Sequence, residues 1–225
     1  FNAANNDPMY VGYMYGTSGS LASNRTNTNN SIIKRVIDTW YKDNLNTNYG
    51  KYISTKAIYC NDRSNPAGGY NTGKSTFLYG ADTRLETNKT PTYDCTNVND
   101  KFTVDTSTGN GKLTYPIALM TADEVSFAGG VYAKEAIAWP WYNNNSENGS
   151  STGLSWWWLL SPFHWDNSYA YVFIASNSFG KFGGNSTRMT NGVRPVLSLK
   201  SCVKISGGDG SASDPYTIRE TTSGC

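Results

Sequence analysis

The chain carries little charge. Asp, Glu, Lys and Arg make up 16% of its 225 residues, and 19 basic against 17 acidic side chains leave a formal net charge of +2. No long run of one sign occurs, so nothing favours a nucleic-acid or membrane-surface partner. No segment approaches the ~20 apolar residues of a transmembrane helix. Residues 1–5 lack the basic start and apolar centre of a signal peptide, so we expect a mature or excised part of a longer protein.

Groups suited to catalysis are equally scarce. His164 is the only histidine, so a Ser-His-Asp or Cys-His arrangement would have to use it. It stands between Phe163 and Trp165, with no orienting partner evident in the sequence. A glycosidase needs only two carboxylates, and no pair stands out among the 17 acids. We therefore expect a protein that is not an enzyme and has no cofactor, with a secreted glycan-acting enzyme as a remote alternative.

The four cysteines are widely spaced. They form no C-x-x-C pair, and the chain has only one histidine that could join them as a ligand, so we expect no zinc site. Four cysteines allow three disulfide pairings. Pairing neighbours, Cys60 with Cys95 and Cys202 with Cys225, closes loops of about 35 and 23 residues, each contributing roughly 3–4 kcal/mol in the chain-entropy model. The bridges predict an oxidising, extracellular setting; four buried thiols in a cytosolic protein are the alternative.

What the chain has in abundance is Gly, Tyr and small polar residues. It holds 22 Gly and 16 Tyr, with Asn, Ser and Thr filling much of the remainder. Amides and hydroxyls, rather than charges, solvate such a surface. The high aromatic content argues against intrinsic disorder.

Hydrophobic periodicity predicts helices early in the chain and strands late. A helix is expected over residues 31–45, and the TADE sequence at 121–124 is a capping box that opens a second, shorter one. Strands are expected over 169–175 and 193–199, and residues 61–110 have no sustained period. The expected core residues of the first helix are Ile32, Ile33, Val36, Ile37, Trp40 and Tyr41.

Residues 163–191 are unusual because aromatic rings alternate with Asn, Ser and Gly. Rigid aromatic anchors beside small adaptable polar groups are typical of recognition surfaces. Apolar blocks bracket the segment, WWWLLSP at 156–162 and GVRPVLSL at 192–199. A half-buried β-meander is the alternative interpretation of the same pattern.

Several blocks together resemble the formylglycine-generating-enzyme-like superfamily. Residues 119–130 (LMTADEVSFAGG) are similar to its helix, and GVRPV at 192–196 resembles its Gly-Phe-Arg ending. WYKDNL at 40–45, CNDRS at 60–64 and WWLLSP at 157–162 look like a group of uncharacterised gut-bacterial surface proteins. The resemblance implies an α+β, C-type lectin-like fold, with two main helices packed on a small twisted antiparallel sheet and long irregular loops.

The expected domain spans residues 1–200, with an irregular Asn/Gly/Thr-rich insertion around 61–110. Residues 201–225 would be a disulfide-pinned extension. Resemblance to the variable proteins of diversity-generating retroelements implies a hypervariable ligand-binding face between the Trp-rich block and the closing GVRP strand. The catalytic cysteine pair and the calcium-binding motifs of the wider superfamily have no counterpart here. The predicted ligand-binding residues are Phe163, His164, Trp165, Asn167, Asn177, Phe179, Lys181, Phe182, Asn185 and Arg188.

These observations predict a non-catalytic binding domain, extracellular or on a bacterial cell surface. Its partner would be a protein or glycan on another cell, phage or host surface, and no metal, nucleic acid or membrane insertion is expected. A pilin-like structural subunit that self-assembles through the same face is the main alternative.

Overall fold

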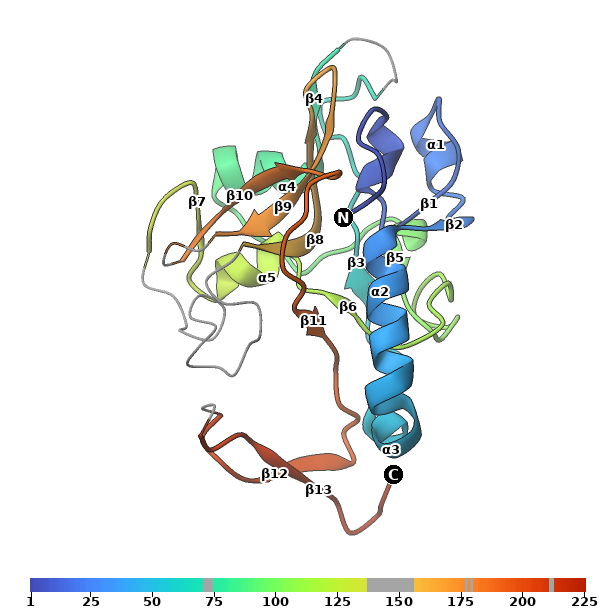
Figure 1. Cartoon of the computed structure of the whole chain (residues 1–225), viewed down its shortest axis with the longest axis vertical. Helices are drawn as coiled ribbons and strands as arrows, with labels where there is room; N and C mark the ends of the chain where they lie inside the picture. The colour runs from blue at the N-terminus through green and yellow to red at the C-terminus, as the bar shows by residue number, and fades with distance from the viewer. Residues whose placement is uncertain (71–74, 137–155, 177, 179, 211–212) are drawn as a thin grey trace.

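The computed structural model describes the chain except residues 71–74, 137–155, 177, 179 and 211–212. Its centre is a five-stranded sheet that curls into half a barrel, with strand order β4-β8-β9-β10-β7 (Figure 1). Only the β10–β7 pair is parallel. The strands are β4 (Phe77–Leu78), β7 (Val131–Tyr132), β8 (Trp157–Trp165), β9 (Ala170–Ala175) and β10 (Lys181–Ser186).

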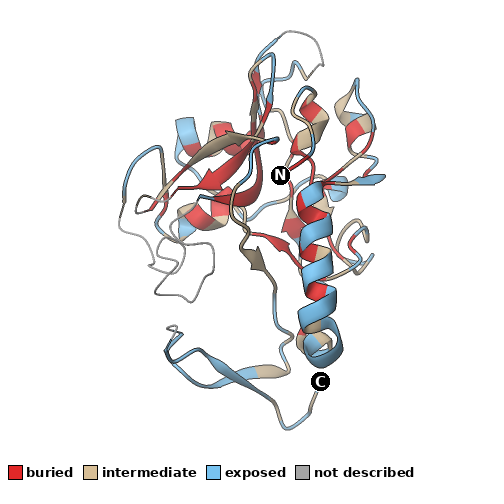
Figure 2. Cartoon of the chain, viewed as in Figure 1, coloured by how far each residue is buried: buried red, intermediate tan, exposed pale blue. Residues whose placement is uncertain are grey.

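Strand β8 lies at the centre of the core, and nearly all of its side chains are buried (Figure 2). Trp157 packs with Phe163 and Phe173 on one face, whereas Trp158 packs with Trp165 and residues of the N-terminal half on the other. Successive side chains of a strand point to opposite faces, so neighbouring tryptophans enter two different cores. Two rings of the Trp run, Trp157 and Trp158, therefore lie in the core, whereas Trp156 is exposed.

Two predicted helices are confirmed. Ser31 caps α2 by accepting a hydrogen bond from the Lys34 amide at 3.2 Å, and Thr121 with Glu124 forms the capping box of α5. The helices are α1 (Leu21–Asn24), α2 (Ile32–Tyr41), α3 (Thr47–Tyr49), α4 (Gly80–Asp82) and α5 (Ala122–Phe127). Further turns are the 3₁₀ helices η1 (Pro8–Val11), η3 (Gly50–Tyr52) and η5 (Val98–Asp100) and the π-helical η2 (Lys42–Asn46) and η4 (Thr83–Asn88).

The predicted fold, two main helices packed on a small sheet, is wrong. The described structure is organised by its sheet, and only α2 has as many as ten residues. Helical periodicity made α2 and α5 conspicuous in the sequence. A strand buried on both faces loses the polar alternation that identifies strands, so the sequence of β8 does not indicate a central strand.

Residues 61–110 contribute to the body of the domain. Strand β4 pairs with β8 at the edge of the central sheet, and α4 with η4 buries Ala81 and Leu85 against one face of it. The irregular sequence therefore holds short elements that local periodicity does not reveal.

Four two-stranded ladders complete the structure. Strand β11 covers only Pro195–Val196 of the expected 193–199. The ladders pair β1 (Met14–Tyr15) with β2 (Asn29–Asn30), β3 (Tyr59–Cys60) with β5 (Lys101–Phe102), β6 (Ala118–Leu119) with β11, and β12 (Val203–Gly207) with β13 (Thr217–Glu220).

The four cysteines form two disulfides, as expected, and of the three possible pairings the structure has the neighbour pairing, Cys60–Cys95 and Cys202–Cys225. The second closes the base of the β12–β13 hairpin, which extends away from the sheet (Figure 1). Structural disulfides persist in oxidising compartments, so the protein is secreted or extracellular. Among the described residues no helix is long and apolar enough to cross a membrane.

Candidate functional site

Three of the predicted binding residues lie in the interior, which corrects the prediction for them. Phe163, Trp165 and Phe182 are 5%, 3% and 1% exposed. They belong to β8 and β10, whose side chains pack into the cores on the two faces of the sheet. Replacing such residues leaves cavities, so a segment that buries these rings tolerates variation only at its exposed positions.

The remaining predicted residues do not form one site. His164 and Asn167 lie near the turn between β8 and β9, and exposed Arg188 follows the adjoining end of β10. Lys181 begins β10 and lies at the opposite end of the sheet. Asn185, half-buried within β10, donates a hydrogen bond to the Asn191 side chain at 3.4 Å. Asn177 and Phe179 lie outside the described residues.

A β-bulge decides where His164 points. Pro162 pairs with Val172 and Trp165 with Ala170, so Phe163 and His164 together oppose the single residue Tyr171. A bulge redirects side chains. Here the imidazole of His164 packs against the rings of Phe163 and Tyr171, with ring centroids 4.1 and 4.6 Å apart respectively.

The carboxylate nearest to His164 in the structure belongs to Asp82. Its carboxylate is fully buried at the end of α4, 3.4 Å from the imidazole Nδ1. Burial and the neighbouring Asp82 raise the pKa of Glu86, one turn further along η4. The two side chains of His164 and Asp82 meet where α4 packs against β8. Among the described residues no group of three or more His, Cys, Asp or Glu is arranged to hold a metal ion.

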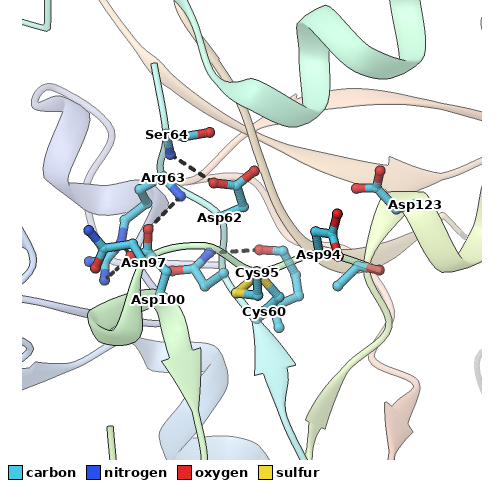
Figure 3. Close-up of a disulfide and its surroundings, with 12 residues drawn as sticks. Cys60, Asp62, Arg63, Ser64, Asp94, Cys95, Asn97, Asp100 and Asp123 are labelled. Carbon is cyan, nitrogen blue, oxygen red and sulfur yellow. Dashed lines mark hydrogen bonds and ion pairs between the residues drawn. A yellow bond between two sulfur atoms is a disulfide. The ribbon is translucent and has the colours of Figure 1, made fainter. Parts of the chain in front are cut away.

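A separate hollow, here called the disulfide pocket, lies beside Cys60–Cys95. It has a volume of about 450 Å³, within the usual range for small-ligand sites. Figure 3 shows the side chains of Asp62, Asp94 and Asp123 near the Cys60–Cys95 disulfide. The lining residues are Ile58, Tyr59, Cys60, Asp62, Arg84, Thr92, Tyr93, Asp94, Cys95, Thr96, Lys101, Leu119, Thr121, Asp123, Glu124 and Ser161.

Arg84 organises one wall of the disulfide pocket. Its guanidinium contacts Asp62 at 2.7 Å and Asp123 at 2.9 Å. Burial alone would lower the pKa of Arg84, but Asp123 and Asp62 outweigh it and raise that pKa. Burial would likewise raise the pKa of Asp62, yet hydrogen bonds from Arg84 and Ser64 hold it below its ordinary value. Arg84 therefore holds the two carboxylates of this wall in place.

The rim of the pocket is aromatic and exposed. Tyr93 is 71% exposed and stacks on Phe127, itself 47% exposed, with ring centroids 4.3 Å apart and planes 16° apart. The segment that carries Tyr93 is held on both sides, by the Cys60–Cys95 disulfide and by a 3.0 Å hydrogen bond from the Thr92 amide to Asp123. Exposed rings held in place by flanking anchors are suited to binding.

Sequence reasoning missed this pocket because its parts are far apart in the chain. They come from β3, η4, residues 92–96, β5, β6, α5 and β8. Two signals were available: the possible pairing of Cys60 with Cys95 and the TADE capping box. The sequence alone did not bring them to one place.

Comparison with known families adds one match. A family model described as "Domain of unknown function (DUF6273)" matches residues 20–201. No curated protein and no solved structure matches the chain. The matched range contains every residue that lines the disulfide pocket and ends before the β12–β13 hairpin. Because the match covers most of the chain, this protein belongs to the DUF6273 family.

Proposed function

We propose that this protein is a non-catalytic ligand-binding domain, displayed on a cell surface, and that the disulfide pocket is its binding site. The observation that carries the proposal is the combination of a hollow of about 450 Å³ with an exposed aromatic ring at its rim, Tyr93, which is stacked on Phe127. Pockets that combine apolar rings with a few fixed polar groups are the usual form of ligand sites.

The state of the pocket carboxylates favours binding over catalysis. Asp62 and Asp123 are engaged by Arg84, and one oxygen of Glu124 accepts the backbone and hydroxyl hydrogen bonds of Thr121. Of the four carboxylates that line the pocket, only Asp94 then has no hydrogen bond or ion pair within the described residues, whereas glycoside hydrolysis needs two carboxyl groups to act together. His164 is not among the residues that line the pocket.

The proposal is tested by screening a fragment library against ¹⁵N-labelled protein and mapping the shifted amides. We expect hits to cluster on Ile58 and on residues 92–96. Tyr93→Ala should abolish them, because it removes the exposed ring. Tyr169→Ala is the matched control, since Tyr169 is also an exposed tyrosine but lies at the β8–β9 turn. Hits that vanish only in the Tyr169 variant, or no cluster at the pocket, would contradict the proposal.

A further inference from the structure

We propose that the disulfide pocket binds a cationic group, a guanidinium or an alkylammonium. This inference rests on the proposed function, because it specifies the ligand of the same site. It follows from three features of the pocket: its charge, its unused carboxylate and its aromatic rim.

The pocket has an excess of negative charge. Four carboxylates line it, from Asp62, Asp94, Asp123 and Glu124, against two cationic groups, Arg84 and Lys101. Low-dielectric walls focus the field of such a hollow on whatever enters it. An anionic ligand is therefore disfavoured, and a cation is attracted.

One of these carboxylates is unused. Within the part of the chain that the structure describes, the Asp94 carboxylate makes no hydrogen bond or ion pair, and only its backbone amide is engaged, to the Thr92 hydroxyl at 3.0 Å. Asp94 is exposed and directly precedes Cys95, whose disulfide holds its position. Arg84 is already occupied by the other two aspartates, so it does not compete for Asp94.

The aromatic rim supplies the second element of cation recognition. The face of an aromatic ring attracts a cation within about 6 Å of its centroid. Phe127 covers one face of the mostly exposed Tyr93 ring. Ile58, which is exposed at the same pocket, can contact the aliphatic stem of a lysine- or arginine-like group. The carboxylate of Asp94, the ring of Tyr93 and the apolar side chain of Ile58 together suit a ligand with a cationic head group on an apolar stem.

The test is an NMR titration of the whole chain with N-acetyl-arginine amide and with N-acetyl-citrulline amide, its uncharged isostere. We expect the arginine probe to shift the amides of residues 92–96 and to bind at least about tenfold more tightly than the citrulline probe, because charge-assisted hydrogen bonds are roughly twice as strong as neutral ones. Raising the salt to about 0.5 M should weaken the binding of the arginine probe.

Two variants locate the interaction. Asp94→Asn keeps the shape of the side chain and should weaken the arginine probe by about tenfold. Tyr93→Leu should weaken it by about two- to fivefold, the usual effect of an exposed cation–π contact. Asp43→Asn is the control, because Asp43 is an exposed acid in η2 outside the pocket. It should leave the affinity for the arginine probe unchanged. Retained amide dispersion checks that each variant is folded.

Further titrations distinguish the possible natural sources of the cationic group and test the alternatives to cation binding. Tighter binding of an arginine-containing peptide than of spermidine indicates a protein side chain as the natural source; the reverse indicates a free amine. Equal binding of the arginine and citrulline probes, or preferential binding of methyl galactoside, overturns the cation proposal. Fragment hits at the pocket without any response to the cationic probes also overturn it, but leave the proposed binding function intact.

Discussion

At the scale of single residues, buried polar side chains replace the regular hydrogen bonding that this loop-rich chain lacks. Arg63 is fully buried, and its guanidinium donates to Asp100 at 2.8 Å and to Asn27 at 2.9 Å. Asn61 accepts from the Tyr13 amide and donates to the Leu160 carbonyl, at 2.9 and 2.8 Å. Since a buried polar group without a partner is costly, these residues fix the paths of the loops that they contact.

Asp62 gives the molecule a predictable response to acid. Its pKa is held below the ordinary value, so its stabilising effect is present above about pH 4, the pKa of an unfolded Asp, and is lost as pH falls through the folded-state pKa. Asp62→Asn should lower the free energy of unfolding by about 1–3 kcal/mol at pH 7. The difference from wild type should narrow progressively below pH ~4.

Urea unfolding at a series of pH values from 7 to 3 measures this difference. Asp43→Asn, at an exposed position, serves as the control and should differ little from wild type throughout. A deficit of the Asp62 variant that stays constant with pH would mean that Asp62 acts by shape alone and not through its charge.

At the scale of elements, α2 has its apolar residues on two sides. Ile33, Ile37 and Tyr41 are buried, whereas three residues expected in the core, Ile32, Val36 and Trp40, are 38%, 51% and 45% exposed. The exposed three recur every four residues and form one stripe. Helical spacing identified α2 correctly but did not reveal which side faces the core, because both sides are apolar.

Matched substitutions on the two sides should have very different effects. Ile37→Ala should lower the free energy of unfolding by about 2–5 kcal/mol, because it leaves a cavity in the core. Val36→Ala, one position earlier, should change it by no more than about 0.5 kcal/mol. Urea denaturation of both variants checks this. Comparable losses at the two positions would show that the Val36 face is buried in solution.

At the scale of the whole molecule, the two disulfides have different structural roles. Cys60–Cys95 joins β3 to the segment that carries the pocket rim, inside the range matched to the family. Cys202–Cys225 closes a hairpin outside that range, whose facing residues Ile205 and Ile218 are both exposed. A lone two-stranded hairpin is marginally stable, so its bridge acts locally.

Paired serine substitutions should separate these roles. Removing Cys60 and Cys95 together should lower the free energy of unfolding by about 3–4 kcal/mol, from a closed loop of 35 residues, and should weaken ligand binding. Removing Cys202 and Cys225 should expose the hairpin amides to hydrogen exchange while the domain unfolds at nearly the same urea concentration. A large shift in that midpoint for the second variant would mean that the hairpin supports the domain.

The sequence by itself determined what depends on neighbours along the chain or on composition. Thr121 and Glu124 cap a helix because they are three residues apart, and Ser31 caps α2 for the same local reason. The four cysteines predicted an oxidising, extracellular setting if they form bridges, and the structure has two disulfides.

Only the tertiary structure decided which residues meet. The bulge in β8 turns His164 toward Asp82, and Arg84 joins Asp62 to Asp123 across 61 residues of sequence. Because β8 is buried on both faces, Phe163 and Trp165, which were predicted to be exposed binding residues, lie in the core. The physical reason is that burial and charge pairing depend on distances in space, which local periodicity does not encode. The candidate binding site therefore emerged beside the first disulfide rather than within residues 163–191.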